Sequence, residues 1–295
     1  MVKKLYKFSH IALSTSSKDI RVLPIATQIY EILTHAGTKV SFDESLERLQ
    51  AKLKVKTKSD KYITNNGELL IAIGGDGTML NCSRKYGSRG IPVLGINLGK
   101  VGFLTDISPE EITSRLLEVI KGDYIEDKRS FLEASVEGKK DAYLALNEVV
   151  IHSGAIAQLI DFDLSIDSKF VYRQKADGLI ISSPSGSTAY SLSGGGPIVL
   201  PNIPVMTLLS MFPHSLLNTS PLIVDDKSKI RIEMIGKKTK AVLSMDSHNS
   251  IKLKKGDIVN ITAGKSHLTL IHPPGHDFFE ACRNKLGWSA VLTKN

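Results

Sequence analysis

Apolar residues in the first third of the chain alternate between short continuous runs and helical spacing. Four continuous runs predict buried strands, at 11–15, 39–42, 69–73 and 91–97. Three segments with helical spacing predict helices between these strands, at 18–35, 44–53 and 79–86. Repeated strand–helix–strand units with fully apolar strands predict a parallel sheet that is covered on both faces.

The pattern changes after about Asp106. One helix is predicted at 109–122, and long alternating or apolar runs then predict antiparallel strands, at 131–138, 141–152, 157–167, 170–184, 229–236, 240–247, 251–264 and 267–273. Helical spacing returns at the end of the chain. We therefore expect an α/β N-terminal domain with a parallel sheet over 1–107, a β-rich C-terminal domain over 108–276, and a C-terminal helix within 277–295 that returns to the first domain.

Composition excludes several classes of protein. The chain has 295 residues, of which 42% are hydrophobic and 23% charged, as in ordinary globular proteins. It has no apolar run of membrane-spanning length, and its first residues lack the apolar stretch of a signal peptide. Its two cysteines, Cys82 and Cys282, cannot form a disulfide framework or a four-cysteine zinc site. These features predict a cytoplasmic protein with no membrane partner.

The charge is basic, with 38 Lys and Arg against 30 Asp and Glu, a formal net charge of +8. The densest basic segment, 51–61, alternates Lys with apolar or hydroxyl residues, which fits a strand that follows phosphates or, more commonly, a solvated edge. No zinc-finger spacing or RNA-binding aromatic signature accompanies it. We expect no nucleic-acid partner, and a positive field that attracts small anionic substrates.

The segment 69–80 carries the first candidate chemistry. A buried strand runs directly into Gly74, Gly75, Asp76, Gly77 and Thr78, and a helix follows. Glycines let the backbone approach a phosphate, and a helix N-terminus offers unpaired N–H donors. The pattern is neither a Walker A loop nor a Rossmann fingerprint. A carboxylate in such a loop repels phosphate, so Asp76 is expected to accept a proton or to hold Mg²⁺; the alternative is a turn cap.

Two further segments have nucleotide-binding character. Residues 176–199 combine an apolar strand with hydroxyls, glycines and Tyr190, which provide donors, close approach and a stacking face. Asn147 and Glu148 stand side by side in an otherwise apolar strand and are expected to point to opposite faces. At least one of them should face a polar site, and the alternative is a glutamate at a strand edge.

These segments resemble the bacterial NAD kinases. The resemblance covers most of the chain in order, at 74–80, 95–106, 146–152, 176–199, 213–216, 245–248 and 283–288. The GGDGT loop alone is shared with diacylglycerol kinases and 6-phosphofructokinases. The segment 176–199 and the Asn147–Glu148 pair make the resemblance specific to NAD kinases.

The resemblance implies transfer of the ATP γ-phosphoryl group to the adenosine-ribose 2′-hydroxyl of NAD, which makes NADP. Mg²⁺ or another divalent metal accompanies ATP, and Asp76 is the general base. The implied partners are the small molecules NAD and ATP and further copies of the chain, as a homo-oligomer that is a tetramer by analogy. The alternatives are another GGDGT-type lipid or sugar kinase, or a non-catalytic NADP-binding sensor.

The resemblance also implies a set of nucleotide-contacting residues in an active site between the two domains. They are Gly74, Gly75, Asp76, Gly77, Thr78, Phe103, Asn147, Glu148, Gln158, Lys175, Asp177, Thr188, Ala189, Tyr190, Ser191, Leu192, Ser193 and His248. Gln158 replaces a His or Arg of some relatives, and His248 replaces a common Gln. Thr219 and Ser220 follow PHSL where the family usually has an arginine. His272 and His276 flank Pro-Pro-Gly and indicate a rigid turn, and no residue is assigned as a metal ligand.

Overall fold

The computed structural model describes residues 6–49, 53–99, 102–154, 158–214, 220–236 and 241–288. The chain forms two compact units: one contains the residues up to Lys128 and those from Leu268 onward, and the other is Arg129–His267. The chain therefore passes between the units at 128/129 and 267/268, whereas the sequence pattern placed these changes at 107/108 and 276/277.

The first unit is built on a parallel sheet, as predicted. Its strands lie in the order β5-β4-β1-β2-β3, with the last residues of β17 beside β5. The bounds are β1 (His10–Ser14), β2 (Lys39–Asp43), β3 (Thr57–Lys58), β4 (Leu69–Ile73), β5 (Val93–Ile96) and β17 (Ile258–His272). Every residue of β1, β4 and β5 is buried, which explains their continuous apolar sequences.

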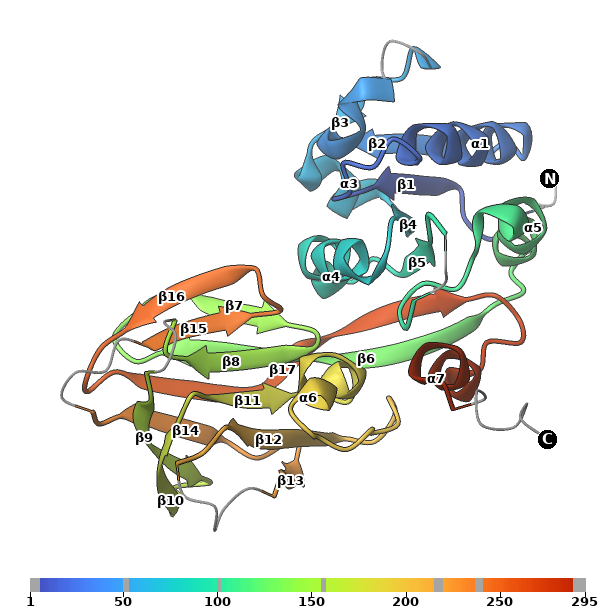
Figure 1. Ribbon diagram of the computed structural model, residues 1–295. Coiled ribbons are helices and arrows are strands. Elements are labelled where there is room, and N and C mark those ends of the chain that lie inside the picture. The colour runs from blue at the N-terminus through green and yellow to red at the C-terminus, as the bar shows by residue number, and fades with distance from the viewer. Residues whose placement is uncertain are drawn as a thin grey trace, which may run out of the picture. The chain divides into compact units, whose positions relative to one another are not determined.

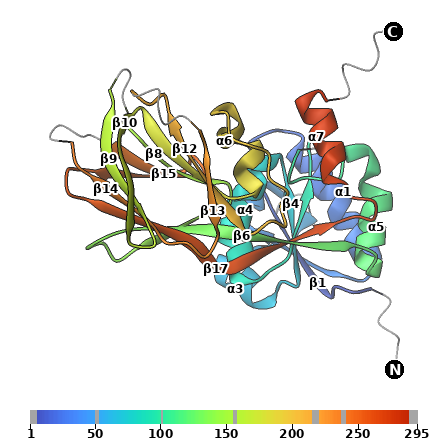
Figure 2. The ribbon, with the colours of Figure 1, turned by 90° about the horizontal axis from the view of Figure 1, so that it is seen from below.

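Helices cover both faces of this sheet. Figures 1 and 2 show α1 and α5 on one face and α3 and α4 on the other. The helices are α1 (Val22–His35), α3 (Asp60–Asn66), α4 (Asp76–Lys85), α5 (Ile112–Lys121) and α7 (Phe278–Leu286), with 3₁₀ turns η1 (Glu44–Leu49), η2 (Gly87–Arg89) and η3 (Pro109–Glu111). No helix among the described residues is long and apolar enough to cross a membrane.

Of the helix expected at 44–53, residues 44–49 form the 3₁₀ segment η1, with a kink at Leu46, Leu53 is helical, and residues 50–52 lie outside the described part of the chain. The start of η1 is held by Asp43, whose carboxylate accepts a hydrogen bond from the Ser45 backbone N–H at 3.0 Å. The helix predicted at 79–86 begins earlier than its apolar spacing indicated, at Asp76.

Helix α5 belongs to the first unit because its apolar face joins that unit's core. Leu116, Val119 and Ile120 are fully buried in one cluster with Ile29 and Leu33 of α1. Burying a large apolar side chain stabilises a fold by about 1.5–3 kcal/mol. This packing explains why the domain change falls after α5 and not before it.

The second unit contains two antiparallel sheets, in the strand orders β10-β9-β14-β17 and β13-β12-β11-β8-β15-β16. Their inner faces form one hydrophobic cluster. The remaining bounds are β6 (Ile125–Val136), β7 (Ala142–Ala145), β8 (Glu148–His152), β9 (Ile160–Ile166), β10 (Lys169–Ala176), β11 (Gly178–Ser182), η4 (Ser185–Thr188), α6 (Tyr190–Ser193), β12 (Val205–Met211), β13 (Leu222–Asp225), β14 (Ile230–Met234), β15 (Ala241–Met245) and β16 (Asn249–Leu253).

Two runs that the sequence presents as continuous strands are interrupted at polar residues. The run 141–152 breaks at Leu146 and Asn147, between β7 and β8, and the run 170–184 breaks at Asp177, between β10 and β11. At the first break, the backbone N–H groups of residues 146–148 donate to the Asp246 carboxylate. At the second, the Asp177 N–H donates to the carbonyl of Met211 at 2.9 Å. Asn147 therefore lies outside the strand in which it was expected.

Candidate functional site

In the first unit, the GGDGT loop joins the end of β4 to the start of α4. The Gly74 N–H donates to the Ile96 carbonyl at 2.9 Å, which ties the loop to the neighbouring strand. A Cβ at Gly74 would lie 2.3 Å from Oγ1 of Thr78, so only glycine fits this position. Asp76 is the first residue of α4, where the first-turn N–H groups have no acceptor within the helix.

Backbone amides from a second segment fix the Asp76 carboxylate. Its Oδ2 accepts from the Phe103 N–H at 3.0 Å, and its Oδ1 accepts from the Leu104 N–H at 3.1 Å. Gly102 lies directly against this carboxylate, since a Cβ there would be 2.0 Å from Oδ1. Asp76 is half-buried, and each of its oxygens retains a second lone pair for an incoming proton. The two amides therefore fix the orientation of the Asp76 carboxylate and leave one lone pair on each oxygen able to accept a further hydrogen bond.

The segment that holds Asp76 is itself rigidly bonded. Thr105 Oγ1 accepts from the Asn97 side-chain amide and from the Gly102 N–H, both at 2.8 Å. The Asn97 N–H donates to the Ile107 carbonyl at 2.9 Å. Lys100 and Val101, which belong to the segment singled out at 95–106, lie outside the described residues.

A cavity of about 230 Å³ with a mixed polar and apolar lining opens beyond the ends of β1 and β2. Its polar lining is Thr15, Ser16, Ser17, Lys18, Asp19, Ser45 and Arg48, and Val22, Leu23 and Leu46 complete it. Ser16 donates to Thr78 Oγ1 at 3.1 Å, which joins this cavity to the GGDGT loop. Open parallel sheets bind ligands at the carboxyl ends of their strands, and hydroxyl and cationic groups suit phosphate. The sequence reasoning missed these residues, although hydroxyls clustered directly after a strand were the available signal.

In the second unit, Asn147 and Glu148 are both buried, with exposed fractions of 8% and 4%. Their backbone is held by Asp246, whose carboxylate accepts the N–H groups of Leu146, Asn147 and Glu148 at 2.9, 2.8 and 3.2 Å. Asp246 and Ser247 have positive φ angles of 45° and 58°, in the tight turn between β15 and β16. Asp246 falls in the motif 245–248, but no local pattern links it to residues 146–148, about a hundred positions earlier.

The side chains of this pair have hydrogen-bonding capacity left over. Within the described part of the chain, Asn147 Oδ1 and Glu148 Oε2 are buried and have no hydrogen-bond partner. Burial, reinforced by the nearby Asp246 charge, raises the pKa of Glu148 to about 7, although a hydrogen bond from the Tyr190 backbone opposes this shift. Unpartnered buried acceptors are costly, so the pair is suited to a ligand that brings hydrogen-bond donors.

Most hydroxyls of the segment 182–187 stabilise the loop. Ser183 donates to the Leu146 carbonyl at 2.5 Å, and Ser187 Oγ lies 3.0 Å from the Val199 nitrogen, from which it accepts. Ser185 Oγ accepts from the buried Arg129 guanidinium at 3.1 Å. These contacts shape the segment that carries η4 and α6.

The residues after this loop leave an exposed ring and an unpartnered hydroxyl. The aromatic residue Tyr190 is 43% exposed. The Ser191 Oγ atom is buried and has no hydrogen-bond partner among the described residues. The Tyr190 backbone reaches Glu148, so the structure brings these two predicted segments together. Thr188, Ala189, Leu192 and Ser193 lie in or beside the same two short turns.

Four further predicted residues lie at or near strand ends in the second unit. Lys175 is exposed on β10, with its Nζ 3.5 Å from Asp161 Oδ2. Asp177 is half-buried between β10 and β11, and Gln158 is exposed just before β9. His248 is exposed, with Nδ1 3.2 Å from the Asp246 carbonyl oxygen. The loop residue Thr219 lies outside the described residues, while Ser220 is exposed.

Comparisons with known proteins agree for both halves of the chain. The family model for the ATP-NAD kinase N-terminal domain matches residues 11–124, and that for the ATP-NAD kinase C-terminal domain matches residues 146–273. An NAD kinase of Acinetobacter baylyi is 40% identical over 285 residues, 96% of this chain and 92% of that protein. One of Marinobacter nauticus is 40% identical over 291 residues, 97% of this chain and 98% of that protein.

Two solved structures are similar to this chain along nearly its whole length. A yeast NADH kinase complexed with NADH has a TM-score of 0.88 at 25% identity, covering 97% of this chain and 90% of that one. An NAD kinase from Archaeoglobus fulgidus in complex with ATP has a TM-score of 0.73 at 27% identity, covering 96% of this chain and 99% of that one.

The raised pKa of Glu148 predicts a pH-dependent stability. The native carboxyl titrates near pH 7 and the unfolded one near 4.5, so its stabilising contribution is complete below pH 4.5 and is lost as the pH rises through 7. Relative to Glu148→Gln, the wild type should lose about 3 kcal/mol of unfolding free energy across this window. Denaturant unfolding of both proteins on either side of the window measures this. If the unfolding free energies of the wild type and Glu148→Gln changed equally with pH, Glu148 would have an ordinary pKa.

Proposed function

The chain belongs to the ATP-NAD kinase family, which phosphorylates NAD to NADP with ATP, and we propose that Asp76 is the general base of this reaction. The observation that carries the proposal is the placement of its carboxylate. It lies at the N-terminus of α4 in the GGDGT loop, and two backbone amides orient it. Both family models and the relatives are NAD kinases, so another GGDGT-type lipid or sugar kinase and a non-catalytic sensor are set aside.

Asp76 fits the role of a base for the acceptor hydroxyl. A ribose hydroxyl is a weak nucleophile toward a charged phosphoryl group, and catalysis of phosphoryl transfer relies mainly on positioning and charge stabilisation. A base within hydrogen-bond reach of the hydroxyl adds about 10²–10⁴-fold. The amides of Phe103 and Leu104 hold one lone pair of each Asp76 oxygen and leave the others to accept that proton.

The ATP phosphates are proposed to bind along the first turn of α4 and the cavity joined to it through Ser16. Lys18 and Arg48 on the cavity lining supply positive charge for them. A Mg²⁺ ion carried by the ATP phosphates would neutralise part of their charge. Each Asp76 oxygen accepts one backbone amide and keeps a further lone pair, which could serve the proton or a metal ion; we assign it to the proton.

The dinucleotide is proposed to bind the polar groups of the second unit. Asn147 Oδ1 and Glu148 Oε2 are acceptors without partners among the described residues, and the hydroxyl and amine groups of NAD are donors. Tyr190 offers an exposed ring for stacking. The other proposed contacts in this unit are Gln158, Lys175, Asp177, Thr188, Ala189, Ser191, Leu192, Ser193 and His248. Gly74, Gly75, Gly77, Thr78 and Phe103 are the proposed contacts in the first unit.

The chain is also proposed to form a homo-oligomer in the cytoplasm, a tetramer by family analogy. Large apolar side chains on the second unit support self-association, since Phe170, Phe212 and Ile223 are 63%, 80% and 50% exposed. Cys82 and Cys282 are both buried free thiols, in keeping with a reducing compartment.

Replacing Asp76 with Asn tests the proposed base. The amide accepts one of the two backbone N–H groups but not both, so the variant should lose about 1–2 kcal/mol of stability and still fold. It cannot take the proton, so kcat should fall at least about 10²-fold while NAD still binds. Asp225→Asn is a matched control, because its carboxylate also accepts a backbone N–H, from Lys227, on an exposed turn. Near-normal turnover of Asp76→Asn at saturating ATP, NAD and Mg²⁺ would refute the mechanism.

Replacing Asn147 or Asp177 with Ala tests the proposed dinucleotide contacts. Each variant should weaken NAD binding by about 1–3 kcal/mol, the cost of one lost hydrogen-bond partner. Titration calorimetry with NAD measures this effect directly. Asn260→Ala is the control, since Asn260 bonds Glu137 on the surface of the same unit and should leave NAD affinity unchanged. Unchanged affinity in both test variants would remove these residues from the site.

A further inference from the structure

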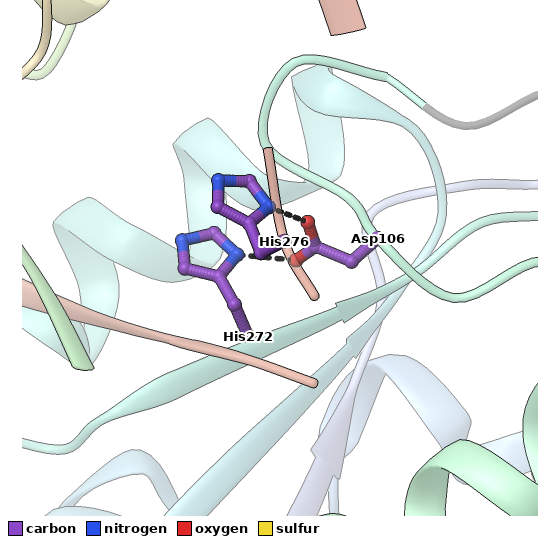
Figure 3. Close-up of side chains that lie close together, drawn as sticks. All are labelled: Asp106, His272 and His276. Carbon is purple, nitrogen blue, oxygen red and sulfur yellow. Dashed lines mark hydrogen bonds and ion pairs between the residues drawn. The ribbon is translucent and has the colours of Figure 1, made fainter. Parts of the chain in front are cut away.

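Three titratable side chains from distant parts of the sequence converge in the first unit (Figure 3). Asp106 follows the segment that holds Asp76, His272 ends β17, and His276 follows the Pro-Pro-Gly turn. His272 Nδ1 lies 2.6 Å from Asp106 Oδ2, and His276 Nδ1 lies 2.7 Å from Asp106 Oδ1. The sequence suggested only a rigid turn here, because nothing in the spacing pairs residue 106 with residues 272 and 276.

The three residues are of types that bind metals, but their geometry favours a hydrogen-bonded clamp. The two imidazole rings are stacked, with centroids 3.7 Å apart and planes 15° from parallel. Lone pairs lie in the ring planes, so nearly parallel rings direct them side by side and not toward one ion. Both Nδ1 atoms already face a carboxylate oxygen, which can only accept while it is ionised.

The charges of the clamp support this assignment. Burial opposes ionisation of Asp106, but hydrogen bonds from His272 and His276 lower its pKa to about 2, so it is a carboxylate at neutral pH. Burial likewise opposes the charge on His272, yet Asp106 and Asp127 raise its pKa. Asp127 Oδ2 lies 3.5 Å from the His272 Nε2 atom. Both histidines thus donate through Nδ1 to one fixed carboxylate.

This clamp acts on the same segment that orients Asp76. Asp106 is two residues beyond Leu104, whose N–H, with that of Phe103, binds the Asp76 carboxylate. The intervening backbone has little freedom, because Thr105 is buried and bonded to Asn97. A shift of the Asp106 side chain is therefore transmitted to the two amides over a short, stiff stretch of chain.

We propose that His272 and His276 are positioning residues for phosphoryl transfer, which fix the 102–106 segment through Asp106 and thereby place the Asp76 carboxylate. The proposal rests on the role of Asp76 given above. The proposal gives the histidines of the turn at residues 272–276 a role in catalysis, although neither takes part in the chemical step. The histidines touch neither Asp76 nor the reacting groups in this account, and they act through the backbone amides of Phe103 and Leu104.

Two variants of His276 separate the hydrogen bond from ring packing. His276 is the accessible partner, with a side chain 17% exposed against 1% for His272, so its replacement is compatible with folding. His276→Phe keeps a stacked ring and removes the donor, whereas His276→Asn loses the ring and keeps an N–H at the position of Nδ1. His276→Phe should lower kcat by about ten- to a hundredfold with both KM values within about twofold. His276→Asn should retain most of the wild-type kcat.

A role in packing alone predicts the opposite order, with His276→Asn the more impaired, and that result would overturn the proposal. So would a wild-type kcat in His276→Phe. Amide hydrogen exchange provides a readout independent of activity: in the unliganded full-length protein, His276→Phe should speed exchange of the Phe103 and Leu104 N–H groups, and His276→Asn should not. Equal protection in wild type and His276→Phe would also count against the clamp.

The coupling to Asp76 is tested by combining variants. In the Asp76→Asn background, His276→Phe should reduce the residual turnover by less than about twofold, because the base that the clamp positions is gone. A loss of the same factor in both backgrounds would show that His276 acts elsewhere, and would overturn the proposal even if Asp76 is the base. Normal turnover of Asp76→Asn alone would instead refute the proposed base, so the two failures are distinguishable.

Discussion

The hydrogen bonds from two backbone amides to the Asp76 carboxylate are the interaction on which the proposed catalytic loop depends. A carboxylate beside bound phosphates is repelled by them and needs compensation from fixed donors. Phe103 and Leu104 provide these donors, and Gly102 allows the close approach. Because the donors belong to the backbone, their direction is set by the segment 102–106 and not by a side-chain rotamer.

The second unit also contains a carboxylate that accepts hydrogen bonds from successive backbone amides. The Asp246 carboxylate gathers three successive amides, at residues 146–148, and bends the chain out of the β ladder at that point. The side chains of Asn147 and Glu148 are then left with acceptor atoms that have no partner among the described residues. Burial, and after it the nearby Asp246 carboxylate, disfavours the charge on Glu148 and raises its pKa. These unpartnered acceptors lower local stability, and the proposed binding of NAD would supply the missing donors.

The sequence predicted the parallel sheet, the β-rich second half and the GGDGT loop, because apolar periodicity and glycine chemistry are local properties. The prediction from sequence failed where a side chain from a distant part of the chain determines the local backbone structure. The strand expected at 141–152 breaks at Asn147 because Asp246, about a hundred positions later, binds its amide. The clamp on Asp106 was missed for the same reason, since His272 and His276 are brought to it only by the return of β17 to the first unit.

The most direct test of this account is the turnover of Gly102→Ala. The added Cβ would lie 2.0 Å from Asp76 Oδ1 and so must displace the carboxylate, while a Cβ at Gly99, in the same segment, meets only the end of the Arg21 side chain at 3.4 Å. Gly102→Ala should therefore lose about 10²-fold in kcat with NAD affinity unchanged, and Gly99→Ala should keep wild-type turnover. Equal turnover of the two folded variants would contradict the claim that the 102–104 backbone places the base.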